Sequence, residues 1–422
     1  MSLVQPEVVE PEVQLSFAQR LDKLAEVAVR VGLNLRQGQE LLITAPLEAV
    51  PLVRRITEHA YRAGALLVST LYSDDETALA RFRFAPDESF DRAATWLHDG
   101  IAEAYRSGTA RLGITGADPS LLSQQDPAKV GRANVAASKA SRAALEFITR
   151  HSINWSIIAC ATPAWARAVF PGEPEQTAVT KLWDAIFRTS RIDAEDPVAE
   201  WQRHGVALHR RRELMNEKRY AGLHFVAPGT DLHVGLADGH LWQGGGSRAQ
   251  NGIECQPNIP TEEVFTTPHK DGVNGTVTST KPLSYQGSLI EGIRVKFENG
   301  RITEAHATKG ERVLEQMIST DEGARKLGEV ALVPHSSPIA SSGLLFWNTL
   351  FDENAASHIA LGQAYSTCMI DGDTAGEKGL FARGANESLI HVDWMIGSGE
   401  MDVYGVKQDG SEEPLMRRGD WV

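Results

Sequence analysis

The hydrophobic residues in the first half of the chain follow two alternating patterns. Phe17, Leu21, Leu24, Ala28 and Val31 recur at steps of four and three, which places them on one face of a helix. Further helices are predicted over residues 50–63, 87–106 and 130–150. Short apolar runs, which we interpret as buried strands, lie between the helices at residues 41–45, 66–72, 110–115 and 155–161. Because strands alternate with helices, the pattern predicts an α/β domain with a parallel sheet over residues 15–215.

The second half of the chain shows mainly the two-residue spacing of half-buried strands. Leu232, Val234 and Leu236 alternate with polar or small residues, and another alternating run leads into Asn299 and Gly300. An Asn-Gly pair between two such runs is a strong signal for a hairpin turn. We therefore predict a mixed, largely antiparallel, β-rich α+β domain over residues 216–422.

Length and composition agree with two globular domains. The chain has 422 residues, which at roughly 150 residues per domain predicts two or three. Apolar residues make up 42% and charged residues 23%, which excludes intrinsic disorder for most of the chain. Residues 1–14 are rich in glutamate, valine and proline, and we expect them to form a flexible arm.

The acidic charge balance and the few cysteines narrow the class of protein. The formal net charge of −13 repels phosphate backbones and anionic lipids, so we expect neither a nucleic acid nor a membrane as a partner. Residues 1–14 lack the cationic region and the apolar run that are typical of a signal peptide, and no run of about 18 apolar residues occurs in the sequence. Three cysteines are too few and too scattered for a disulfide framework. We therefore expect a soluble, cytoplasmic protein.

A strand over residues 390–396 carries the first candidate for chemistry. Side chains alternate between the two faces of a strand, so His391 and Asp393 share one face, opposite an apolar one. An imidazole and a carboxylate so placed can bind one metal ion or two adjacent ions, at about 2.0–2.2 Å for zinc. The alternative is a solvated strand face with an incidental hydrogen bond between the two side chains.

Residues 352–365 are a second candidate segment. We predict a helix capped by Asp352, which would place His358 and Tyr365 on one face, two turns and about 10 Å apart. Such a pair could act as a metal ligand and as a phenol that donates to an oxyanion. The alternative is a half-buried surface histidine and a core tyrosine.

Two further segments bring carboxylates to the same half of the chain. Glu329 lies at the start of an apolar strand and is either a ligand or a solvated strand end. Glu262 and Glu263 are adjacent in a segment flanked by Pro260 and Pro268. Only one of them can point inward if this segment is extended. The alternative is a polar surface loop.

The order and spacing of these four segments resemble those of the thermophilic metalloaminopeptidase family, of the aminopeptidase T, AmpS and PepS type. The resemblance is carried by residues 258–266, 327–335, 350–365 and 391–393. It extends over nearly the whole chain, although more loosely before about residue 220. The family resemblance implies a hydrolase that removes the N-terminal residue of short peptides.

The resemblance also implies roles for particular residues. The metal ligands would be Glu263, Glu329, His358, His391 and Asp393. They would bind two divalent metal ions per chain, zinc or cobalt. The catalytic residue would be Tyr365. Family spacing favours Glu263 over its neighbour as the ligand. The C-terminal domain would be the catalytic one, and a homodimer would enclose the site in an internal cavity.

These residue types suit hydrolysis of a peptide bond. Three carboxylates and two imidazoles offset the charge of two divalent ions, which together lower the pKa of a water molecule between them. That metal-activated water would attack the first peptide bond, and the metals with the Tyr365 hydroxyl would stabilise the oxyanion. The leaving amine needs a proton, for which Glu262 and Glu353 are candidates.

Two other functions remain open at this point. His358, His391 and Asp393 could form the two-histidine, one-carboxylate triad of a mononuclear iron ring-cleaving dioxygenase of hydroxypyridine type. Such an iron site does not need Glu263 and Glu329 as further inward carboxylates. A catalytically inactive, peptide-binding relative is the third hypothesis, and the complete set of candidate residues argues against it.

Overall fold

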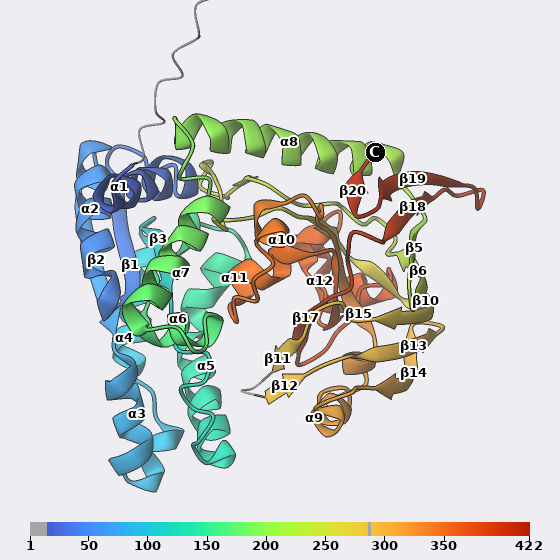
Figure 1. The fold of residues 1–422 in the computed structure, drawn as a ribbon, viewed down its shortest axis with the longest axis horizontal. Helices are drawn as coiled ribbons and strands as arrows, with labels where there is room; N and C mark the ends of the chain where they lie inside the picture. Colours follow the sequence, from blue (N-terminus) through green and yellow to red (C-terminus); the bar gives the residue numbers. More distant parts are fainter. Residues whose placement is uncertain (1–14, 286–287) are drawn as a thin grey trace, which may run out of the picture.

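The computed structural model describes residues 15–285 and 288–422. The predicted arm over residues 1–14 lies outside these residues. The described chain forms an N-terminal part with a parallel sheet and a C-terminal part that is mostly antiparallel (Figure 1), as predicted. The boundary that we expect after residue 215 lies within helix α8 (Pro197–Lys218) and stays a prediction. In Figure 1 this helix runs along the top of the molecule from one part to the other.

The N-terminal sheet has four strands in the order β2-β1-β3-β4, and every pair is parallel. The strands are β1 (Glu40–Pro46), β2 (Leu67–Ser73), β3 (Ala110–Thr115) and β4 (Trp155–Ala159). All four predicted strands are therefore present. The expectation of a buried strand over residues 66–72 was wrong, because β2 is an edge strand on which Leu67 and Tyr72 are exposed.

The N-terminal part also contains the helices that come before α8 in the chain. They are α1 (Phe17–Val27), α2 (Val50–Arg62), α3 (Asp75–Phe84), α4 (Thr95–Arg106), α5 (Pro127–Thr149), α6 (Pro163–Val169) and α7 (Glu175–Thr189). The single helix predicted over residues 87–106 was wrong. A short 3-10 turn (Asp87–Asp91) precedes α4, and Arg132 of α5 pairs with both Asp87 and Asp91. The backbone is extended at Arg92, between the turn and α4, which separates the two elements.

An eight-stranded antiparallel sheet dominates the C-terminal part, in the order β14-β13-β10-β6-β5-β18-β19-β20. Its strands are β5 (Gly222–Ala227), β6 (Thr230–Leu236), β10 (Pro268–Thr278), β13 (Arg294–Glu298), β14 (Arg301–His306), β18 (Asp402–Val406), β19 (Glu412–Arg417) and β20 (Asp420–Trp421). The predicted hairpin turn joins β13 to β14. Asn299 and Gly300 have the positive φ angles, 49° and 81°, that this turn requires.

A second, four-stranded antiparallel sheet has the order β17-β16-β15-β9. Its strands are β9 (Val264–Thr266), β15 (Leu327–Leu332), β16 (His358–Gly362) and β17 (His391–Met395). Two short ribbons pair β7 (Ser247–Arg248) with β8 (Glu254–Cys255) and β11 (Leu283–Tyr285) with β12 (Ser288–Ile290). The helices of this part are α9 (Glu311–Met317), α10 (Pro338–Ser342), α11 (Thr349–Asp352) and α12 (Gly372–Ala382).

The two parts share an apolar core at their contact. Ile339 of α10 and Phe351 of α11 are fully buried within the core of the N-terminal part, beside Trp165. The Trp165 ring packs 5.7 Å from the ring of Phe351, centre to centre. The connection from β15 to β16 is therefore held by the N-terminal part. Among the described residues, no helix is both long and apolar enough to cross a membrane.

Candidate metal centre

The five predicted ligands come together on the four-stranded sheet. Glu329 lies in β15, His358 begins β16, and His391 and Asp393 lie two apart in β17. Glu263 comes directly before β9. Because β16 pairs with both β15 and β17, residues far apart in the sequence become neighbours. The alternation predicted for β17 is present, since Trp394 on the opposite face is buried.

Glu329 lies between the two histidines. One of its oxygens, Oε1, is 3.4 Å from Nε2 of His358, and the other, Oε2, is 3.8 Å from Nε2 of His391. Glu263 Oε2 lies 3.4 Å from the first histidine, and Asp393 Oδ1 lies 3.3 Å from the second. The donor atoms therefore form two sets of three that share Glu329.

Both histidines point the same nitrogen toward the carboxylates. The Nδ1 atom of His358 lies 3.1 Å from the carbonyl oxygen of Ala356, and Nδ1 of His391 lies 2.7 Å from that of Gln363. A carbonyl oxygen can only accept, so each Nδ1 carries the hydrogen and donates it. The Nε2 atoms are then free to bind a metal once they are unprotonated, and a backbone partner of this kind fixes the ring of a metal-bound histidine.

The residues fit a cation at this position. Glu263 and Glu329 are only 7% and 5% exposed, although buried carboxylates are costly unless they are paired or bind metals. Glu263 Oε2 and Asp393 Oδ1 are fully buried and have no hydrogen-bond partner among the described residues. Carboxylate and imidazole are also the ligands that zinc and similar ions prefer.

The pKa values show how strongly the metal-free cluster interacts. Burial raises the pKa of the Glu263 carboxyl, and the nearby Glu329 and Asp393 raise it further despite the attraction of His358. Burial opposes the charged form of each histidine, but the carboxylates outweigh it. They raise the pKa of His358 to about 10 and that of His391 to about 9. Without a metal ion, protons on the two histidines balance the negative charge of the carboxylates. A bound cation could supply this positive charge instead.

The helix predicted over residues 352–365 was wrong. Asp352 ends α11 instead of capping a helix, and its carboxylate accepts hydrogen bonds from the amides of Phe346 and Asn348. His358 starts a strand, because this segment pairs on both sides with β15 and β17. Tyr365 follows that strand, and its ring lies 4.7 Å from the ring of His391, centre to centre. His358 and Tyr365 therefore lie near the same centre, but a strand and the segment after it place them there instead of a helix.

The adjacent glutamates diverge, as an extended segment requires. Glu263 joins the cluster, whereas Glu262 points to Arg191, with N–O distances of 2.6 and 2.9 Å. Glu353, just after α11, is half-buried next to the centre. Its pKa is raised well above the usual range, by burial first and then by the negative charge of Glu263 and Asp393.

A cavity of about 800 Å³ opens onto the centre. Glu263, Glu329, Glu353, Tyr365, His391 and Asp393 line it, together with residues of the N-terminal part. Among the latter are His151 and Trp155, which sequence reasoning missed. They follow an ordinary helix and begin an ordinary strand, so no local pattern marks them as part of a site.

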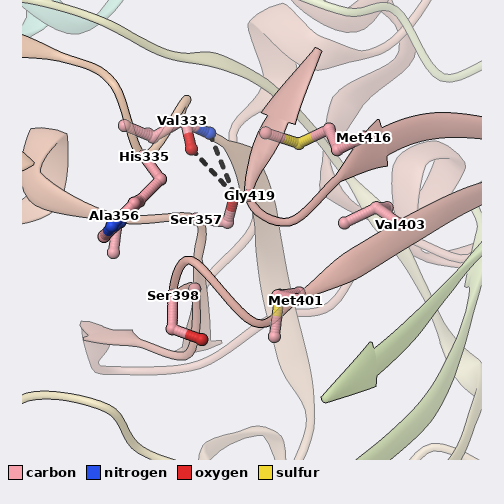
Figure 2. A pocket seen from close by; sticks show the side chains of 10 residues that line it. Val333, His335, Ala356, Ser357, Ser398, Met401, Val403, Met416 and Gly419 are labelled. Carbon is pink, nitrogen blue, oxygen red and sulfur yellow. Dashed lines mark hydrogen bonds between the residues drawn. The ribbon is translucent and has the colours of Figure 1, made fainter. Parts of the chain in front are cut away.

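Ser357 fixes the strand that begins at His358. Its hydroxyl accepts a hydrogen bond from the amide of Val333 at 3.1 Å and lies 3.2 Å from the carbonyl oxygen of the same residue (Figure 2). Its own carbonyl oxygen accepts from the amides of Ile396 and Gly397. This one residue therefore ties the ends of β15 and β17 to β16, next to the first histidine.

Two sets of nitrogen and oxygen donors, most of which line a cavity, are the arrangement expected of a metal-dependent enzyme. A sequence model of the thermophilic metalloprotease family (M29) matches residues 17–421. The chain belongs to this family. The predicted family and the predicted enzyme class, a metal-dependent peptidase, are thereby confirmed.

Comparison with individual proteins agrees. Aminopeptidase T of Thermus thermophilus is 55% identical over 407 residues, covering 96% of this chain and 99% of the relative. The solved structure of wild-type AmpT from Thermus thermophilus matches with a TM-score of 0.92 and 53% identity, over 96% of this chain and 100% of that one. A 2,5-dihydroxypyridine dioxygenase from Pseudomonas putida KT2440 shares the fold, with a TM-score of 0.53 at 16% identity over 97% and 98% of the two chains.

Proposed function

We propose that this protein is an aminopeptidase that removes the N-terminal residue of short peptides at a centre of two divalent metal ions. One observation carries the proposal: two sets of three donors, Glu263, Glu329 and His358 on one side and Glu329, His391 and Asp393 on the other, share a single carboxylate. Glu329 faces each set with a separate oxygen, so its carboxylate would contribute to both metal positions. The similarity to aminopeptidase T supports the choice of reaction.

The metal ions would supply the charge that this chain's residues leave unbalanced. When bound, divalent ions such as zinc or cobalt would activate a water molecule and polarise the carbonyl group of the peptide bond. Glu263 with His358 would hold one ion, and His391 with Asp393 would hold the other. The donor set accommodates either zinc or cobalt and does not choose between them.

Tyr365 would donate a hydrogen bond to the developing oxyanion. Burial, and then the negative charge of Glu329 and Asp393, raises the pKa of its hydroxyl above the usual value. The hydroxyl therefore keeps its proton at neutral pH and can act as a donor throughout the reaction. Its place beside His391 in the cavity lining supports contact with the substrate.

Glu353 would transfer the proton to the leaving amine. Its carboxyl lines the cavity next to the centre, where a general acid and base must lie, and burial with the nearby carboxylates raises its pKa, which favours the protonated form. Glu262, the other candidate, is occupied by its ion pair with Arg191. This contrast favours Glu353 for the role.

The alternative of a mononuclear iron dioxygenase is less well supported. The similarity to a dihydroxypyridine dioxygenase is at the level of fold. His358, His391 and Asp393 also do not form one compact set, since Glu329 lies between the two histidines. An iron triad leaves Glu263 and Glu329 as buried carboxylates without a function.

The cavity suits a short peptide better than a folded protein. Its volume of about 800 Å³ is in the range of small-ligand sites, and both parts of the chain line it.

We further propose a homodimer in the cytoplasm, as family resemblance implies. Exposed apolar side chains such as Phe84 and Trp96 are compatible with a covered surface. Analytical ultracentrifugation should then give twice the chain mass of 46.0 kDa, whereas a stable monomer would contradict the dimer.

Hydrolysis of leucine para-nitroanilide tests the proposed function. The metal-loaded protein should release para-nitroaniline, and removal of metal by a chelator should abolish the activity until zinc or cobalt is restored. The matched control is the N-acetylated substrate, which lacks the free amine and should not be cleaved. Ring cleavage of dihydroxypyridine by the iron-loaded protein, without any peptidase activity, would favour the alternative.

A further inference from the structure

Residues of the N-terminal part reach the segment that carries Glu263. Arg191 lies between α7 and α8, and its guanidinium makes a two-pronged ion pair with Glu262, at 2.6 and 2.9 Å. The side chains are only 12% and 2% exposed, so water does not compete for the pair. A buried, bidentate pair of this kind fixes direction as well as distance.

His204 of α8 completes the contact. Its Nδ1 atom lies 3.2 Å from Nη2 of Arg191, and its Nε2 atom lies 2.8 Å from the carbonyl oxygen of Thr261. Because a guanidinium only donates and a carbonyl only accepts, the hydrogen lies on Nε2 and the ring is neutral. Burial, above all, lowers the pKa of His204, which agrees with a neutral ring.

These contacts hold the two residues that precede Glu263. Thr261 is held through its carbonyl oxygen, and Glu262 through its carboxylate. The amide of Glu262 also donates to Oδ1 of Asn354 at 2.7 Å, next to Glu353. On the other side, Gly244 packs against Glu263, where a Cβ atom at Gly244 would lie 2.5 Å from the Glu263 carbonyl oxygen. Glu263 therefore has little freedom to turn away from the cluster.

The second set of donors does not share this support. His391 and Asp393 lie on β17, whose position depends on pairing with β16. The Nδ1 atom of His391 is fixed by the carbonyl oxygen of Gln363. None of the contacts of Arg191 or His204 described above involves this strand.

We propose that Arg191, His204 and Glu262 form a clamp that positions Glu263, so that one of the two metal positions depends on the N-terminal part of the chain. The inference rests on the proposed two-metal centre. It assigns positioning roles to three residues that are not among the five predicted metal ligands. The metal position beside Glu263 and His358 depends on the clamp, and the position beside His391 and Asp393 does not.

Stepwise zinc binding to the full-length protein tests the clamp. We would compare the wild type with Glu262→Gln and Arg191→Lys, using competition with a chromophoric chelator to obtain each zinc affinity. The zinc affinity of one position, which we assign to the side of Glu263 and His358, should fall by about 10–100-fold in both variants. A loss of this size is usual when a group that orients a metal ligand is removed. The affinity of the other position should stay at the wild-type value. A purely structural role would not produce such a difference between the two positions.

Two further variants make the result decisive. The matched control is Arg132→Lys, which alters the ion pairs with Asp87 and Asp91 elsewhere in the N-terminal part, at 2.7 and 2.5 Å, and should leave both affinities unchanged. If the single variants do not fold, Arg191→Met combined with Glu262→Met removes both charges and should give the same selective loss.

Two results would overturn the clamp: unchanged affinities in Glu262→Gln, or equal weakening of both. A wild-type protein that binds a single zinc ion would instead contradict the two-metal function itself.

Discussion

Tyr365 lines the cavity beside His391, and its hydroxyl keeps its proton at neutral pH. We expect Tyr365→Phe to reduce kcat on leucine para-nitroanilide by about 10²–10³-fold, the usual loss when one oxyanion donor is removed. Metal content, measured by elemental analysis, should not change, because the phenol is not one of the proposed ligands. The matched control is Tyr72→Phe, an equally exposed tyrosine on edge strand β2. Unchanged turnover in Tyr365→Phe would refute the assigned role.

Metal binding should release protons at neutral pH. In the metal-free protein the pKa values of His358 and His391 are raised to about 10 and about 9, so both rings carry an extra proton at pH 7. A metal binds only the unprotonated nitrogen. Affinity should therefore rise as pH increases toward these values and weaken as pH falls.

Calorimetry can count these protons. Zinc titrations at pH 7 in two buffers that differ in ionisation enthalpy should give different apparent enthalpies. Identical enthalpies in both buffers would show that no protons leave and that the histidines are already neutral. The same titration of a His391→Ala variant should release fewer protons than the wild type.

At the residue scale, most residues of the cluster could be predicted from the sequence, but the residues that position them could not. The adjacent Glu262 and Glu263 could be recognised as a pair of which one points inward, because alternation in an extended segment is a local rule. The ion-pair partner of Glu262, the glutamate that points away from the cluster, could not be predicted from the sequence. Arg191 has a positive φ of 59° between two helices and lies 71 residues away in sequence. No local pattern links an arginine to such a distant carboxylate.

Ser357 links three strands of the ligand-bearing sheet. We expect Ser357→Ala to lower the free energy of unfolding by about 1–3 kcal/mol, because the buried amide of Val333 loses its hydrogen-bond acceptor. Thermal or denaturant unfolding of the metal-free protein measures this difference. Ser319→Ala, at an exposed serine after α9, is the matched control and should have little effect. Equal stability of both variants would mean that the hydroxyl does not stabilise the sheet.

At the scale of elements, the alternating strand β17 was predicted, but the fully buried strand β16 was missed. The strand at residues 391–395 was predicted because apolar and polar residues alternate along it. The strand His358–Gly362 was mistaken for part of a helix, since every residue in it is buried and no alternation is visible. Its strand form follows from pairing with β15 and β17, which are distant in sequence.

At the scale of the molecule, the fold brings the two parts together around one cavity. The parallel and antiparallel halves were predictable from the spacing of apolar residues. Their contact was not, because it depends on side chains such as Ile339 and Phe351 that look like ordinary core residues of their own half. The cavity is likewise shared, with Trp155 from β4 and Glu329 from β15 in one lining.

Anomalous diffraction from crystals of the zinc-loaded protein tests the central claim most directly. The account predicts two peaks per chain, one beside Glu263 and His358 and the other beside His391 and Asp393, with the Glu329 carboxylate between them. A single peak, or peaks away from these side chains, would contradict the two-metal centre.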